Sequence, residues 1–287
     1  MAFTFARSDR SLERGARRIG REQVGRALSQ IDAPAVPPPV AVHEVRKAVK
    51  RLRALLRLLR PGLSDHATLD MLLRDAARHV AALRDADVLL HTLETLSPGG
   101  LPALRAALHA RRDAGGADTE TALAACRATL TEAAPMLRGL SLTGSSDDVL
   151  HAGLSVTLRR AQAANRIALR AESAVALHEF RKRVKDHLYH ARLLTPLWPE
   201  LMHPHAEAAE LLSETLGQMN DIAVFVEALA PLDLPEEERT AALALAHLRH
   251  DRLALTALPL AARLFAGRPE DLADRWCALW AIWMAEA

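Results

Sequence analysis

The chain has 287 residues, of which 50% are hydrophobic but only 3% aromatic, and its formal net charge is +2. Because leucine and alanine favour helices, and valine and isoleucine are too few for a large sheet, we expect an all-α fold with an aliphatic core. The near-neutral net charge does not by itself indicate any class of binding partner. Cys126 and Cys277 are the only cysteines, lie far apart in sequence and belong to no CxxC motif or His/Cys ladder, so neither a disulfide framework nor a zinc site is indicated and we expect reduced thiols. No long apolar run indicates a membrane span or a signal peptide, so we expect a cytoplasmic protein.

Proline and glycine divide the chain into a series of predicted helices. The expected ranges are 8–30, 39–60, a helix from Ser64 or Asp65 to about 83 with a further apolar segment to 96, 101–113, 119–138, 148–171, one capped by Ser173, and three that follow Pro204, Pro235 and Pro269. Residues 140–148 are the best boundary between two halves. Tryptophans at 276, 280 and 283 share one helical face, which is typical of a core or an interface rather than a cofactor site.

A stretch of twenty residues occurs twice. Residues 42–61 read VHEVRKAVKRLRALLRLLRP, and residues 177–196, at an offset of 135, read LHEFRKRVKDHLYHARLLTP, with ten identical positions. The similarity continues to Arg84-Asp85 and Asn220-Asp221. A period of this length is too long for a solenoid repeat and predicts two homologous helical bundles packed about a pseudo-twofold axis. We therefore expect a single domain over 8–284, made of the halves 8–140 and 148–284.

Basic residues form one face of each repeated helix at 100° per residue. The first basic stripe consists of His43, Arg46, Lys47, Lys50, Arg53 and Arg57, and the second consists of His178, Arg181, Lys182, Lys185 and Arg192, with Tyr189 in the same sector. The chain has only four lysines, and all of them lie at matched positions of the two stripes. On the helices before each stripe, Arg17 and Arg21, and later Arg166, belong to similar arginine faces.

The charge of the two copies predicts a polyanionic partner. Residues 42–61 hold seven basic side chains and one acidic one, and residues 177–196 hold five and two. Like charges stacked along a helix are unfavourable, so solvated helix faces usually mix both signs. For either copy alone, a solvated face remains the alternative. For His43 and His178, the alternative is a hydrogen bond across the bundle that holds helices in register.

Motifs of the common enzyme classes are missing, namely GxGxxG after a strand, the P-loop, GxSxG and HExxH. The histidine pairs 187/190 and 247/250 have a spacing that suits a metal, but no carboxylate or thiol pattern accompanies them. We therefore expect no catalytic residues, no metal, no cofactor and no enzymatic activity.

The repeated HExRK segments, each followed about 40 residues later by RD or ND, resemble the CHAD family, the conserved-histidine α-helical domain. This resemblance implies two pseudo-symmetric helical bundles around a central basic channel that binds inorganic polyphosphate, with a role at polyphosphate granules. It places the family's histidines at His43 and His178 and its basic positions on the two stripes. Asp186, His187 and Leu188 stand where the first copy has Arg51, Leu52 and Arg53, so the second stripe is expected to contribute less at its C-terminal end.

Three other functions use the same charges: a nucleic-acid binder, a scaffold for acidic proteins, and a phosphohydrolase acting on polyphosphate. Proteins that bind single-stranded nucleic acid usually add aromatic side chains to a basic groove, and only Tyr189 fits that description here. A polyanion near the two histidines is expected to raise their pKa values.

Overall fold

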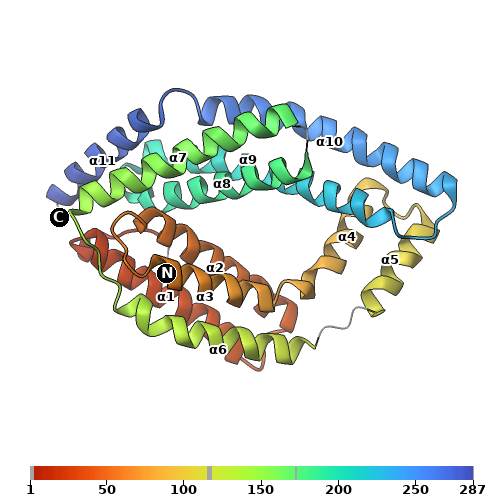
Figure 1. The fold of residues 1–287 in the computed structure, drawn as a ribbon, viewed down its shortest axis with the longest axis horizontal. Coiled ribbons are helices and arrows are strands. Elements are labelled where there is room, and N and C mark those ends of the chain that lie inside the picture. The colour runs from red at the N-terminus through yellow and green to blue at the C-terminus, as the bar shows by residue number, and fades with distance from the viewer. Residues whose placement is uncertain (1–2, 115–117, 172, 287) are drawn as a thin grey trace.

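The computed structural model describes residues 3–114, 118–171 and 173–286, apart from the side chains of residues 82, 84–86, 114 and 169–171. Within these ranges all regular structure is helical, which confirms the all-α fold (Figure 1). The α-helices are α1 (Leu12–Asp32), α2 (Pro38–Leu59), α3 (His66–His79), α4 (Ala82–Leu96), α5 (Pro102–Ala114), α6 (Thr119–Arg138), α7 (Ser146–Ala171), α8 (Ala174–Leu194), α9 (Pro199–Leu229), α10 (Glu236–Leu264) and α11 (Pro269–Ala285). The 3-10 helices are η1 (Arg7–Asp9) and η2 (Thr195–Leu197).

Most helix ends follow local sequence signals. Pro38 occupies the first turn of α2, where its missing N–H costs nothing. The hydroxyl of Ser173 accepts a hydrogen bond of 3.1 Å from the N–H of Ala176 and so caps α8, as predicted. Two predicted starts were wrong: α1 begins only at Leu12, because Ser11 caps it, and α9 begins at Pro199 rather than after Pro204.

The structure has two apolar cores, and they do not follow the two halves of the sequence. The first core joins α1, α2, α3 and α6 to α11, to the starts of α7 and α9 and to the end of α8. The second core joins α4 and α5 to α10 and to other parts of α7, α8 and α9. In Figure 1, α4 and α5 reach away from α1 and α3 and lie beside α9 and α10. The carboxylate of Glu238 on α10 accepts hydrogen bonds from the N–H groups of Ala103 and Leu104 and thereby caps α5.

The chain termini close the first core. The N–H of Phe5 donates to the carbonyl of Leu193 at 3.0 Å, and the Phe5 ring lies edge-on to Trp280 at 5.2 Å. The three tryptophans of α11 are at most 4% exposed, which confirms that they belong to the core. No helix in the described ranges has the length and apolar character needed to cross a membrane.

Packing partners recur in the two halves, because α1 packs on α2 as α7 packs on α8, and α6 packs on α1 as α11 packs on α7. Helices α2 and α8, which carry the two copies, have bounds that match within one residue at the offset of 135. This recurrence agrees with the duplication seen in the sequence. The duplication and the central channel remain predictions.

Helices α2 and α8 touch through a buried histidine. Nε2 of His190 lies 2.9 Å from the carbonyl oxygen of Ala54, and the imidazole is fully buried. Burial lowers the pKa of His190 from 6.5 to about 4, although the hydrogen bond to Ala54 opposes this shift. The imidazole is therefore neutral in the folded protein over most of the acidic range.

A neutral His190 makes stability depend on pH. Because the unfolded chain binds this proton near pH 6.5 and the folded chain only near pH 4, stability is complete above pH 6.5 and falls as the pH decreases. We expect His190 to lower the free energy of unfolding by roughly 2 kcal/mol between pH 7 and pH 5. Urea titrations at several pH values measure the slope. His190→Leu, which introduces the residue of the matched position in the first copy, should make the slope less steep. Part of the slope should remain, because burial also lowers the pKa of His187. The exposed control His203→Gln should leave the slope unchanged. An unchanged slope in His190→Leu would contradict the assignment.

Candidate anion-binding site

A cavity of about 490 Å³ brings the two basic stripes together. Arg46 and Lys50 of α2 line it with His178 and Arg181 of α8, and α5 adds Arg111. Four of the predicted site residues, two from each copy, thus share one cavity. Arg111 could not have been found from the repeat, because it lies outside both copies.

The wall formed by α9 supplies the acidic and amide groups of this cavity. Nδ1 of His178 lies 2.7 Å from Oδ1 of Asn220, a hydrogen bond that joins α8 to α9. Asp221 and Glu227 also line the cavity, so four arginine and lysine side chains and His178 share it with two carboxylates. The contact of His178 is the hydrogen bond across helices that was the alternative to ligand binding. His178 makes this contact while it lines the cavity.

The four lysines occupy three kinds of surroundings. Lys47 pairs with Glu44 at 3.5 Å and Lys182 pairs with Glu179 at 2.7 Å, and both pairs have the spacing i,i+3. Lys50 lines the cavity. Burial, followed by the charges of neighbouring arginines, lowers the pKa of Lys185. An anion beside Lys185 would offset both effects and favour its charged form.

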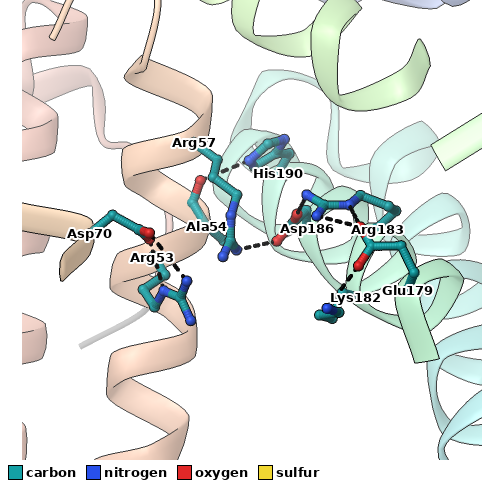
Figure 2. Close-up of polar contacts among 9 residues, drawn as sticks. All are labelled: Arg53, Ala54, Arg57, Asp70, Glu179, Lys182, Arg183, Asp186 and His190. Carbon is teal, nitrogen blue, oxygen red and sulfur yellow. Dashed lines mark hydrogen bonds and ion pairs between the residues drawn. The ribbon is translucent and has the colours of Figure 1, made fainter. Parts of the chain in front are cut away.

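Carboxylates from other helices neutralise the C-terminal part of each stripe. Arg53 forms two hydrogen bonds with Asp70 of α3, and Arg57 reaches from α2 to Asp186 of α8 at 2.6 Å (Figure 2). The remaining pair of this kind joins Arg192 to Glu210 of α9 at 2.5 Å. The basic faces therefore carry less unpaired charge than their sequences indicate.

Asp186 is the centre of the contact between the two stripes. It is only 4% exposed, and Arg183 reaches its second oxygen at 3.2 Å (Figure 2). Arg183 and Lys182 also hydrogen-bond Glu179; these bonds outweigh the effect of partial burial and hold the pKa of Glu179 at about 2. The sequence departure at Asp186 thus provides an interhelical ion pair.

The other predicted residues lie outside the cavity. Arg17 donates to the carbonyl of Leu140 and pairs with Glu13, contacts that support the end of α6. Tyr189 is 6% exposed and lies edge-on to Phe3, so its ring belongs to the core and offers no stacking face.

Three more predicted residues, His43, Arg21 and Arg166, are exposed on α2, α1 and α7, and they do not line the cavity. The side chains of Arg84 and Asp85, predicted to match Asn220 and Asp221, lie outside the described residues.

Nothing in the described part of the chain has the arrangement of a metal site, since it has no group of three or more His, Cys, Asp or Glu side chains placed to hold an ion. Cys126 and Cys277 are free thiols, and burial raises the pKa of each to about 11. Such thiols are poor nucleophiles at neutral pH.

The family model of the CHAD domain matches residues 18–230. The chain belongs to the CHAD family. It is also similar in fold to the crystal structure of the CHAD domain from the plant Ricinus communis, with a TM-score of 0.54 and 19% identity, over 97% of this chain and 93% of that chain. No curated protein is significantly similar to it in sequence. The range matched by the family model contains both repeated HExRK segments. Similarity to the plant domain at 19% identity concerns the fold alone.

Proposed function

We propose that the protein binds inorganic polyphosphate, without hydrolysing it, in the cavity between the two basic stripes. The observation that carries the proposal is the meeting of Arg46 and Lys50 with His178 and Arg181 around one cavity. Polyphosphate is a flexible chain of negative charges without bases, so a binder needs spaced cations and no aromatic platform. Family membership supports the same ligand. We extend the proposal to association with polyphosphate granules in the cytoplasm.

Removing one cation from each copy should weaken binding strongly. The double variant Lys50→Gln with Arg181→Gln is expected to raise the Kd for long-chain polyphosphate by roughly thirtyfold, since it removes two charge-assisted contacts of about 1 kcal/mol or more each. Isothermal titration at fixed salt measures the change. The matched control, Arg127→Gln with Arg268→Gln, removes the same charge from exposed ion pairs on α6 and before α11. Equal losses in both double variants would show that only overall charge matters.

Two competing functions predict different results in the same assay. A nucleic-acid binder would release polyphosphate when RNA or DNA is added at equal phosphate concentration, whereas we expect polyphosphate to be retained. A phosphohydrolase would release orthophosphate during incubation with Mg²⁺ or Mn²⁺, whereas we expect none. Either contrary result would overturn the corresponding part of the proposal.

A further inference from the structure

A second cavity, of about 380 Å³, lies between the end of α2, α7 and α8. Four guanidinium groups line it, from Arg57, Arg60, Arg160 and Arg183, together with the carboxylate of Asp186. It shares no lining residue with the cavity proposed to bind polyphosphate. Of its four arginines, only Arg57 belongs to a basic stripe.

The arginines of this second cavity are only partly compensated. Asp186 accepts from Arg57 at 2.6 Å and from Arg183 at 3.2 Å, and Arg183 is further paired with Glu179. Arg60 and Arg160 form no ion pair with any carboxylate in the described part of the chain. The cavity therefore holds more positive than negative charge.

The fields of these groups act on one another. Burial, followed by the charges of Arg60 and Arg183, lowers the pKa of Arg160, and the carboxylate of Asp186 offsets this only in part. Like charges gathered beside a wall of Pro61, Ala152 and Val156 are unfavourable, because water there screens them less than in bulk. A bound anion would remove that repulsion.

We infer that the second cavity binds a small inorganic phosphate, either orthophosphate or pyrophosphate, at a site separate from the polyphosphate cavity. Guanidinium groups donate two parallel hydrogen bonds to phosphate oxygens, a geometry that a lysine ammonium does not offer. Asp186 accepts hydrogen bonds from Arg57 and Arg183 and so holds their guanidinium groups in place. Arg60 and Arg160 would supply the other hydrogen bonds to the ligand.

The second cavity is built by both halves of the chain but has no counterpart related to it by the repeat. At the offset of 135, the positions that match Arg60, Arg160 and Arg183 hold a threonine, a glycine and an alanine. The site is therefore not a second copy of a repeated feature. All of its cations are arginines, whereas the lysines of this chain are confined to the two stripes.

Titration of the full chain with orthophosphate and with pyrophosphate, in chloride buffer, tests the inference. We expect saturable binding, and a rise in Kd of about tenfold or more in the double variant Arg60→Gln with Arg160→Gln, because two charge-assisted contacts are lost. Both side chains are exposed, so the variant should fold normally. The matched control is Arg159→Gln with Arg268→Gln. Arg159 is the sequence neighbour of Arg160, but it pairs with Glu270, and Arg268 pairs with Asp271, so neither lines the second cavity. The control should bind as the unchanged protein does.

Three results would overturn the inference: no binding of either probe, equal loss in the control, or a loss of polyphosphate binding alone in Arg60→Gln with Arg160→Gln. The last result would make the cavity part of the polyphosphate track. Failure of the proposed function is a different outcome: Lys50→Gln with Arg181→Gln would then leave polyphosphate affinity unchanged while orthophosphate or pyrophosphate still bound to the second cavity.

Discussion

Raising the monovalent salt from 50 to 200 mM is expected to weaken polyphosphate binding by roughly a thousandfold. Each cation that contacts a phosphate displaces a condensed counterion, and this release becomes less favourable as the salt concentration rises. About six contacts are needed for an effect of this size. The cavity offers four cations. Lys47 follows the lining residue Arg46 on α2, and Lys185 lies one turn after the lining residue Arg181 on α8, so these two lysines are the expected fifth and sixth contacts.

The slope of log Kd against log salt separates direct contacts from general charge. In Lys50→Gln with Arg181→Gln the slope should decrease by the contribution of about two phosphate contacts. The control Arg127→Gln with Arg268→Gln should leave the slope unchanged. Titrations at four or five chloride concentrations between 50 and 200 mM give the slope. Binding that ignores salt would rule out an electrostatic site, and a slope of only one or two would show that the ion pairs seen within the protein persist when polyphosphate binds.

The sequence predicted the helices well because their signals are local. Proline at helix starts, the Ser173 cap and the apolar face of α2 each depend on residues within a few positions of one another. The cationic face of α2 and its copy on α8 follow from the same periodicity. These features required no knowledge of how the helices pack.

The amount of free charge on the stripes could not be predicted in the same way. Arg57 and its partner Asp186 are 129 positions apart, and Arg53 and Asp70 lie on different helices. In the sequence, Asp186 indicates only a weaker second stripe. In the structure it is the buried acceptor that joins α2 to α8, and it shapes a cavity that no repeat pattern indicates.

The sequence also did not indicate that α4 and α5, which belong to the first half, pack into the second core. The first half breaks at Val80 and Ala81 into α3 and α4, without proline or glycine, whereas the matching segment of the second half is the uninterrupted α9. The sequence predicted one helix to about residue 83, followed by a further apolar segment to 96, and so did not place the break at Val80 and Ala81. The break allows α5 to bring Arg111 to the cavity that we propose to bind polyphosphate.

Replacing Gly153 by alanine is expected to destabilise the protein by about 3 kcal/mol or more. At this position α7 crosses α2 so closely that a Cβ atom would lie 1.9 Å from the carbonyl oxygen of Leu58 and 2.8 Å from its carbonyl carbon. Both are backbone atoms, so no rotation of a side chain can relieve the clash, and the two helices must separate. Glycine to alanine within a helix normally stabilises by about 0.5–1 kcal/mol, so the expected sign is reversed.

Gly25→Ala is the matched control, because it lies within α1 and a Cβ atom there would have no neighbour within 4 Å. Urea unfolding should show this variant slightly more stable than the unchanged protein and Gly153→Ala much less stable. If Gly153→Ala unfolded at the same urea concentration as the unchanged protein, the close contact of α2 with α7 would be wrong. The packing of α2 against α7 brings Arg57 and Arg160 into the second cavity. The inferred phosphate site therefore depends on this packing as well as on its charges.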